Sequence, residues 1–148
     1  MRRVDREIPK AEAMELLRET KAGVLAMVDS DGAPYAIPVN HALIDGALII
    51  HCARAGRKID CLRNDNRVCY TAYRMIHISP EKLTTKYTSA VVTGRAELVE
   101  DLEVKLDLLG RMTEVLAPGA RFTCDDRTVA DTGLIRIKIE GITGKANR

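Results

Sequence analysis

The sequence predicts a mainly β protein: a small antiparallel barrel of about six strands, with three helices appended to it. The predicted strands follow one another through tight turns that contain Asp and Gly, as at 29–32 and 45–46. The helical patterns lie near both ends of the chain and in one crossover, whereas in a parallel sheet they would alternate with the strands. With 148 residues, the chain is expected to form one domain over residues 1–148.

The first half of the predicted barrel is one helix followed by three strands. In residues 9–19, apolar side chains recur on one face between charged ones, which predicts an amphipathic helix that begins near Pro9. Strands are then expected over 23–28, 34–44 and 47–52. Because proline donates no backbone hydrogen bond, Pro38 should lie at an edge, at a bulge or where a ligand replaces strand pairing. The second strand is therefore expected to border a pocket.

The second half is predicted to hold the remaining strands and the longest helix. Residues 74–85 contain Pro80 and mix polar with apolar side chains, so they are interpreted as a crossover loop. Leucines and Met112 recur at near-helical intervals over 101–116, which predicts the longest helix with a buried leucine stripe. The polar residues 120–131 are expected to form a loop. The other elements are a short helix over 57–63 and strands over 67–73, over 86–99 with a kink at Gly94, and around 135–139.

The overall charge of the chain is nearly balanced, with a formal net charge of +2, 30% charged residues and 46% hydrophobic residues. This balance is typical of a globular protein without a polyanion-binding surface, and only 3% of the residues are aromatic. No apolar run approaches the roughly 20 residues that cross a bilayer, and the charged residues 1–7 are unlike a signal peptide. The sequence therefore predicts a cytoplasmic protein that binds neither nucleic acid nor membrane.

The strongest functional signal lies in residues 48–71. An apolar strand passes through His51 into a loop that contains one glycine and the cations Arg54, Arg57 and Lys58, and a helical pattern follows. Free backbone N–H groups at a helix start, the positive end of the helix dipole and neighbouring cations together favour a phosphate monoester. The spacing differs from that of the G-x-x-x-x-G-K-[ST] loop, so a magnesium nucleotide is not expected. The alternative is that these cations are solvated surface residues.

The four cysteines form no C-x-x-C pair and are expected to be reduced, buried thiols. The alternative is a zinc site that combines Cys52, Cys61 and Cys69 with His51 or His77, although these separations match no usual ligand spacing. The sequence contains no paired carboxylates, no serine triad and no G-x-S-x-G elbow. Catalysis without a cofactor is therefore not expected, and no catalytic residue is assigned.

The order of these segments resembles one known family, the pyridoxamine 5′-phosphate oxidase-like flavin-binding split barrels, and within it the branch named for nitroimidazole resistance. The likeness extends over nearly the whole chain, and the ordered succession is far more specific than any single segment. It rests on residues 1–3, 5–8, 23–26, 31–40, 51–53, 56–60, 67–69, 80–87, 94–96 and 142–146. The resemblance implies that the barrel is an FMN-binding split barrel.

The resemblance also implies a homodimer that binds two FMN molecules in clefts between the subunits. Arg57 and Lys58 match the basic pair that contacts the FMN phosphate, and His51 matches a residue near the cofactor on the third strand. The other matching residues are Pro38, Val39 and Asn40, on the strand against the isoalloxazine ring, and Thr84, Thr85, Lys86 and Ser89, on a segment that approaches the cofactor.

Two functions are consistent with these expectations. One is an FMN-dependent oxidoreductase that reduces a nitroaromatic, nitroimidazole-like or otherwise electron-poor small molecule, as the family branch implies. The other is a flavin- or haem-binding module that stores or senses its ligand without turnover. Haem would call for a histidine or another axial ligand in an open pocket, whereas the basic loop favours phosphate. His41 is expected to be a structural residue.

Overall fold

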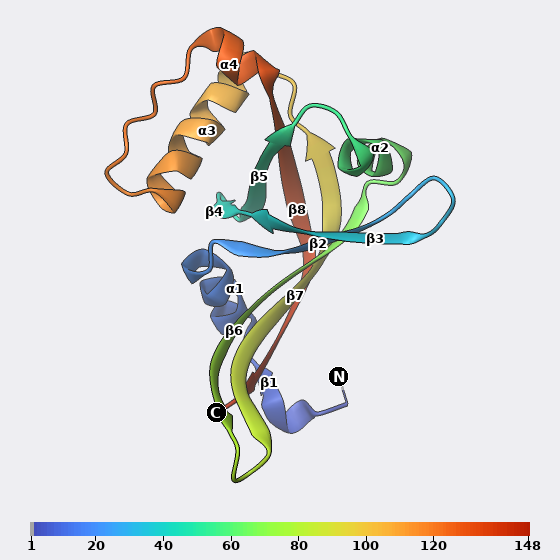
Figure 1. Ribbon diagram of the computed structural model, residues 1–148, viewed down its shortest axis with the longest axis vertical. Coiled ribbons are helices and arrows are strands. Elements are labelled where there is room, and N and C mark those ends of the chain that lie inside the picture. Colours follow the sequence, from blue (N-terminus) through green and yellow to red (C-terminus); the bar gives the residue numbers. More distant parts are fainter. Residues whose placement is uncertain (1) are drawn as a thin grey trace.

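The computed structural model describes residues 2–148 and consists of one curled antiparallel sheet with helices packed against it (Figure 1). The strand order is β3-β2-β6-β7-β8-β5-β4, and the short β1 pairs with β8. The strands are β1 Glu7–Ile8, β2 Ala22–Val28, β3 Pro34–Asn40, β4 Ala42–Ile44, β5 Ala47–Ala53, β6 Arg67–Ser79, β7 Thr84–Leu98 and β8 Thr132–Asn147. The helices are the 3₁₀ turn η1 Val4–Arg6 and the α-helices α1 Lys10–Glu19, α2 Arg57–Asn64, α3 Leu102–Leu116 and α4 Asp126–Asp131.

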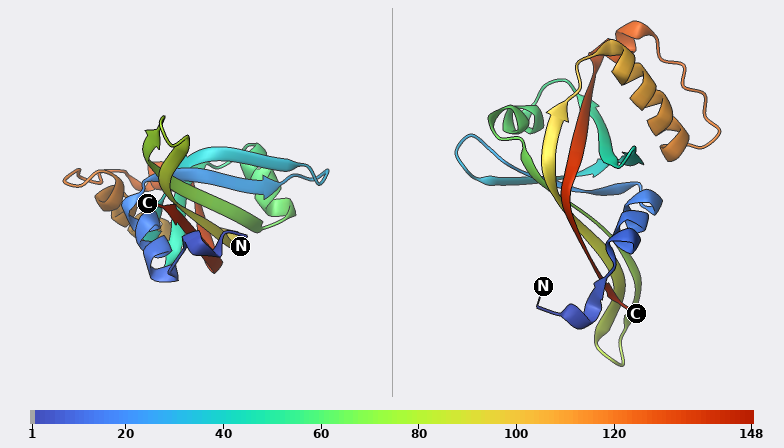
Figure 2. Two further views of the ribbon diagram at one scale, coloured as in Figure 1. Left: turned by 90° about the horizontal axis from the view of Figure 1, so that it is seen from below. Right: turned by 180° about the vertical axis from the view of Figure 1, so that it is seen from behind.

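Three long strands, β6, β7 and β8, form the centre of the sheet. The register between β7 and β8 shifts between Thr93 and Gly94, where the sequence predicts a kink. Glycine is required there because a Cβ would lie 2.1 Å from the Lys138 carbonyl oxygen of the neighbouring strand. The resulting bend lets the sheet curl around its core, as the two views in Figure 2 show.

The concave side of the sheet encloses the main hydrophobic core, which α1 closes. Alternate residues of the central strands are buried, and Leu25 of β2, Tyr70 of β6 and Val92 of β7 form one paired row. α1 adds buried residues that repeat at helical spacing, namely Ala13, Leu16 and Leu17. A second, smaller cluster lies among α3, α4, β4 and β5 and includes Ala42, Ile44, Ile49, Leu108, Leu109, Met112, Val129 and Leu134.

The predicted first half of the chain is largely confirmed. The turn between β4 and β5 places Asp45 at φ 50° and Gly46 at φ 77°, the left-handed conformations that an Asp-Gly hairpin turn adopts. Pro38 lies on β3, which is an outer strand of the sheet, so it lies at an edge as expected. The predicted strand over 34–44 is interrupted at His41, which separates β3 from β4.

The largest difference from the prediction concerns residues 74–85, which are not a crossover loop. β6 continues to Ser79 and β7 begins at Thr84, so the two strands form a long hairpin with a turn at 80–83. Pro80 lies in that turn, where its missing N–H costs no strand hydrogen bond. Both faces of the distal part of β6 are exposed in a single chain, so the alternation that reveals a half-buried strand is absent there.

The numbers of elements also differ from the prediction. The described residues form eight strands and four α-helices, where about six strands and three helices are predicted. The additional strands, β1 and β4, are two and three residues long, and α4 has six residues within the predicted loop over 120–131. Such short segments contain less than two periods of any pattern, so sequence periodicity cannot reveal them.

The buried face of α3 differs from the predicted leucine stripe. Leu102 and Leu106 are 41% and 42% exposed, whereas the buried residues are Lys105, Leu108, Leu109 and Met112. Asp101 caps the helix, because its carboxylate accepts a hydrogen bond from the Val104 N–H at 2.9 Å. The helix is therefore rotated so that a lysine, and not a leucine, faces the end of the sheet.

Candidate functional site

The predicted strand, glycine loop and helix are present at the basic loop. β5 ends at Ala53, α2 begins at Arg57, and Gly56 precedes the helix with φ 118°, a conformation that favours glycine. The Gly56 carbonyl accepts hydrogen bonds from the N–H groups of Ile59 and Asp60. The backbone N–H groups at the very start of α2 have no partner within the helix, so they are available to an anion.

Arg57 is oriented by residues of the β2–β3 turn and of β3. Its guanidinium donates to an Asp29 carboxylate oxygen at 2.9 Å and lies 4.3 Å from the centre of the Tyr35 ring. The hydrogen bond from Arg57 is the main reason why the pKa of Asp29 is below its ordinary value, and the N–H groups of Ala33 and Asp31 lower it further. The β2–β3 turn therefore holds one of the two predicted phosphate-binding cations in place.

Lys58, the second predicted phosphate-binding cation, lies close enough to Cys52 for its charge to act on that thiol. It is half-buried and belongs to no ion pair within residues 2–148. Burial raises the pKa of the Cys52 thiol, and the positive charges of Lys58 and Lys105 oppose this increase. Lys58 is thus a cation without an anionic partner next to the helix start.

The predicted flavin-facing strand, β3, lies against β5 near this loop. β3 pairs only with β2, with Pro38 opposite Val24 and Val39 opposite Gly23, and it also contacts β5. The other edge of β3 is free of strand pairing in the described chain. The Asn40 side chain donates to the Lys21 carbonyl at 3.2 Å, so its amide is already oriented by the chain.

The two histidines on these strands differ in environment. His51, on β5, is exposed and remains available to a ligand. His41, immediately after β3, is fully buried: its Nε2 donates to the Leu17 carbonyl at 2.8 Å, and its Nδ1 accepts from the Tyr70 hydroxyl at 2.6 Å. Burial lowers the pKa of His41, which keeps it neutral. His41 is therefore the structural residue that the sequence predicts.

The second group of predicted residues lies at the other end of the molecule. Thr84, Thr85, Lys86 and Ser89 belong to the first half of β7, in the hairpin that extends away from α2 in both Figure 1 and Figure 2. The Asn147 side chain donates to the Thr84 hydroxyl at 3.1 Å and to the Thr85 carbonyl at 2.6 Å. A single chain therefore does not bring this group together with the basic loop.

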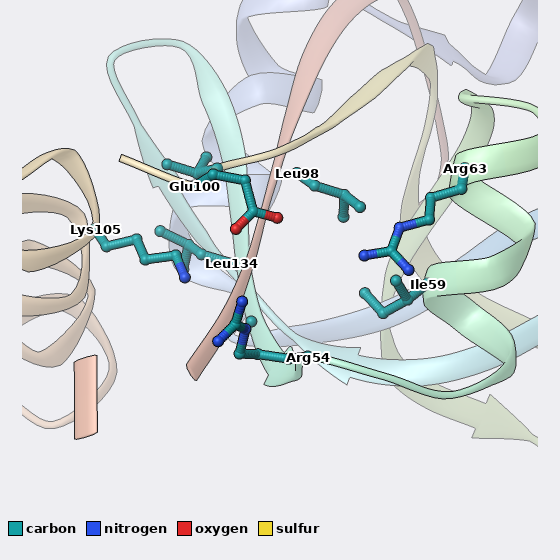
Figure 3. Close-up of a pocket in the computed structure, with 9 residues that line it drawn as sticks. Arg54, Ile59, Arg63, Leu98, Glu100, Lys105 and Leu134 are labelled. Carbon is teal, nitrogen blue, oxygen red and sulfur yellow. The ribbon is translucent and has the colours of Figure 1, made fainter. Parts of the chain in front are cut away.

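A third group of functional side chains was not predicted from the sequence, except for Arg54. A cavity of about 50 Å³ lies between α2, α3 and the adjoining ends of β7 and β8 (Figure 3). Charged residues Arg54, Arg63, Glu100 and Lys105 line it. The only sequence signal for this cavity is the position of Lys105 within the apolar pattern of α3.

The convex face of the sheet carries mostly small or apolar side chains that are open to solvent. Successive paired positions across β3, β2, β6, β7 and β8 form one row: Pro38, Val24, Thr71, Val91 and Thr143. Val24 and Val91 are 38% and 39% exposed, and Tyr73 on the next row is 68% exposed. This surface, called the convex face below, exposes uncharged side chains along this row.

The predicted thiols and the alternative zinc site can be compared with the structure. Cys61 is buried and Cys52 half-buried, but Cys69 and Cys124 are exposed, so the prediction of buried thiols is wrong for these two. Cys69 lies on the convex face, where strand alternation directs it away from the core. Within residues 2–148, no three His, Cys, Asp or Glu side chains are grouped as a metal site would require.

None of the helices in residues 2–148 is long and apolar enough to cross a bilayer.

Comparison with models of known protein families matches most of the chain to one family. A family model described as pyridoxamine 5′-phosphate oxidase matches residues 9–146. None of the curated proteins matches the sequence significantly.

Solved structures share the fold over most of their length. A candidate 5-nitroimidazole antibiotic resistance protein from Bacteroides thetaiotaomicron is 23% identical with a TM-score of 0.81, covering 94% of this chain and 85% of that one. A FAD-binding protein from Mesorhizobium loti is 27% identical with a TM-score of 0.73, covering 97% of this chain and 98% of that one. The flavocytochrome Anf3 from Azotobacter vinelandii is 21% identical with a TM-score of 0.80, covering 95% and 68%. The expected split-barrel fold is thereby confirmed.

Proposed function

Because the chain belongs to the pyridoxamine 5′-phosphate oxidase family, we propose that it is a flavin-dependent oxidoreductase that binds FMN between two copies of itself. Its substrate is an electron-poor small molecule, and nitroaromatic compounds such as nitroimidazoles are the leading class. The observation that carries the proposal is the loop from Ala53 to Lys58. It combines a glycine with a positive φ, a helix start and three cations on one short segment.

The residues of the loop fit a phosphate monoester. Gly56 lets the chain enter α2 with its first N–H groups free of helix partners, and Lys58 supplies a charge that pairs with no carboxylate among the described residues 2–148. Arg57 already donates a hydrogen bond to the Asp29 carboxylate. Because a guanidinium carries five N–H donors, it can bind a carboxylate and a phosphate at the same time. Charge-assisted hydrogen bonds of this kind are the strong ones in protein–phosphate recognition.

The other residues of this end of the sheet would orient the ring system. The flavin, when bound, supplies the electron transfer, and the side chains of this protein bind it, direct it and exclude water. Pro38 and Val39 offer an apolar edge, and Asn40 offers a side-chain amide held by the Lys21 carbonyl. Exposed His51 would lie beside the ring or the ribityl chain.

A second copy of the chain would complete the site. Thr84, Thr85 and Lys86 lie far from the basic loop in one chain, so they would contact a flavin bound there only from a partner subunit. The convex face supports this assembly, because it exposes uncharged strand residues that a homodimer would bury. The proposed homodimer therefore rests on an incomplete site and on an unpartnered sheet face.

The proposal of FMN as the flavin rests on the basic loop and not on the relatives. The Mesorhizobium loti protein is described as FAD-binding, which supports a flavin but not FMN in particular. The basic loop offers one helix start to a phosphate group, which supports the mononucleotide. A haem-binding module, the alternative function, has less support, because the basic loop favours a phosphate. Both ring nitrogens of His41 are engaged, so of the two histidines on these strands exposed His51 is the one that could ligate iron.

A cytoplasmic location is part of the proposal. The four cysteines are all free, which fits a reducing compartment.

The binding test replaces both loop cations. In the double variant Arg57→Ala/Lys58→Ala, we expect FMN affinity to fall at least about tenfold, because each lost charge-assisted hydrogen bond contributes about 1.5–3 kcal/mol. Flavin fluorescence titration measures the affinity, and circular dichroism checks the fold. The control Lys10→Ala removes an exposed cation at the start of α1 and should leave FMN affinity unchanged. Equal affinity in the double variant and the wild type would refute the phosphate assignment.

The activity test follows electrons from the flavin to the substrate. Photoreduced holoprotein is mixed anaerobically with a nitroimidazole, and the return of the oxidised flavin spectrum is recorded. We expect reoxidation faster than that of free reduced FMN at the same concentration. A rate no higher than that of free FMN would count against the reductase and favour the binding module.

A further inference from the structure

We propose that the cavity between α2 and α3 is a second anion site, which takes one phosphate group and is separate from the loop that would bind the FMN phosphate. Three cations and one carboxylate line it: Arg54 from the β5–α2 loop, Arg63 from the end of α2, Lys105 from α3 and Glu100 from the segment before α3. Figure 3 shows the charged ends of these four side chains directed into one space.

Lys105 is the most informative of these residues. Its side chain is only 3% exposed, and its ammonium donates to the carbonyl oxygens of Thr132 at 3.0 Å and Ala130 at 3.4 Å. Two carbonyl groups leave one of its three N–H donors free and leave the charge without a counter-ion. A buried ammonium is unfavourable unless an opposite charge lies close, so the surroundings of Lys105 favour an anion.

The carboxylate in the cavity does not supply that counter-charge. None of the ion pairs within residues 2–148 involves Arg54, Arg63, Glu100 or Lys105. The four side chains together leave two positive charges unbalanced. A phosphate group carries close to two negative charges near neutral pH, and guanidinium groups match its oxygens in pairs.

The size of the cavity limits the ligand to one small group. A volume of about 50 Å³ has room for about three or four waters, which is close to the size of one tetrahedral oxyanion. A flavin ring system does not fit this volume. Apolar residues Ile59, Leu98 and Leu134 form the remaining wall, so a phosphate here would be partly shielded from solvent.

This site adjoins the proposed flavin site but does not depend on it. Arg54 lies three residues before Arg57, and Cys52 lies near both Lys58 and Lys105. The phosphate could therefore come from free inorganic phosphate or from the second phosphate of a flavin dinucleotide. Only the second source involves the proposed flavin site, and it would require a flavin dinucleotide in place of FMN.

Titration calorimetry of the full-length, flavin-free protein with inorganic phosphate tests the site. To exclude the loop, the background protein carries Arg57→Ala/Lys58→Ala, and we expect it still to bind one phosphate per chain. Adding Arg54→Gln/Arg63→Gln to this background should weaken phosphate binding at least tenfold, whereas adding Lys10→Gln should not. If the background protein binds neither inorganic phosphate nor FAD, or if binding survives Arg54→Gln/Arg63→Gln, the proposal is overturned.

The variant Glu100→Gln gives a test of opposite sign. Because it removes the only negative charge from the cavity, phosphate should bind several-fold more tightly in this variant. If Glu100 is instead the counter-ion of Lys105, the same substitution would not tighten phosphate binding and could lower the thermal stability of the protein. Either form of that result would overturn the proposal.

A comparison of FAD with FMN identifies the source. In otherwise wild-type protein, Arg63→Gln, which lies outside the basic loop, should weaken FAD binding and leave FMN binding unchanged if the pocket takes the second phosphate of the dinucleotide. If FAD binding is also unchanged while inorganic phosphate binding is lost, free phosphate is the ligand. An equal loss of FMN and FAD binding would mean that the pocket and the loop are one site, which contradicts the proposal.

Discussion

The buried pair of His41 and Tyr70 provides the sharpest stability test. The substitution Tyr70→Phe keeps the ring in the core but removes the hydroxyl that donates to His41 Nδ1 at 2.6 Å. Both side chains are fully buried, so no water replaces the lost donor, and Nε2 remains committed to the Leu17 carbonyl. A buried acceptor left without a partner costs about 1–3 kcal/mol.

The expected change is large enough to measure by two methods. For a chain of this length, 1–3 kcal/mol corresponds to a lowering of Tm by roughly 3–10 °C. Urea unfolding gives the free energy of unfolding directly, with all variants at one protein concentration because self-association would shift the result. The control is Tyr73→Phe, which removes an exposed hydroxyl from the same strand and should change stability by less than about 0.5 kcal/mol. If Tyr70→Phe is as stable as its control, the hydrogen bond assigned to His41 does not stabilise the fold.

Three further predictions concern pH, backbone packing and assembly. The pKa of His41 in the folded protein lies below its ordinary value of 6.5, so the unfolded chain binds more protons as the pH falls through that value. Urea titrations should therefore show a lower free energy of unfolding at pH 5.5 than at pH 7.5. Gly94→Ala should destabilise the protein by more than about 3 kcal/mol, because the new Cβ would lie 2.1 Å from a carbonyl oxygen of the neighbouring strand. The control Gly110→Ala lies within α3, where the nearest atom to the new Cβ is 3.8 Å away, and should stabilise the protein by about 0.5–1 kcal/mol. Thermal denaturation measures both effects. Val91→Arg places a charge on the convex face and should convert the proposed homodimer to a monomer with weakened FMN binding. Light scattering that still shows a dimer would contradict this interface.

The parts of the fold that the sequence predicts are those determined by local chemistry. Asp45 and Gly46 specify a tight turn by their left-handed conformations, and the kink at Gly94 follows from a residue without a Cβ in a long strand. The loop that ends at Lys58 is likewise a local pattern of strand, glycine and helix start. Each of these features depends on residues that are neighbours in the chain.

The parts that were missed depend on contacts between distant segments. The distal hairpin carries Met75 and Ile78 with 56% and 55% exposure, so no burial pattern marks it as strand. Lys105 becomes a buried cavity residue only because α3 packs with that face against the end of the sheet, and a leucine-rich pattern allows more than one choice of face. The separation of Thr84 from the basic loop is a property of the whole fold.

The β6–β7 hairpin has a consequence for how the protein matures. Its turn holds Leu83 at 91% exposure, and Ile76 on the β6 side of the hairpin is 58% exposed. In the proposed homodimer a second copy would cover this hairpin. A newly made chain would expose these apolar side chains until it meets another copy, which makes the hairpin a preferred site of proteolysis and chaperone binding. The amount of working protein should therefore rise more steeply than its rate of synthesis, because chains that meet quickly are spared.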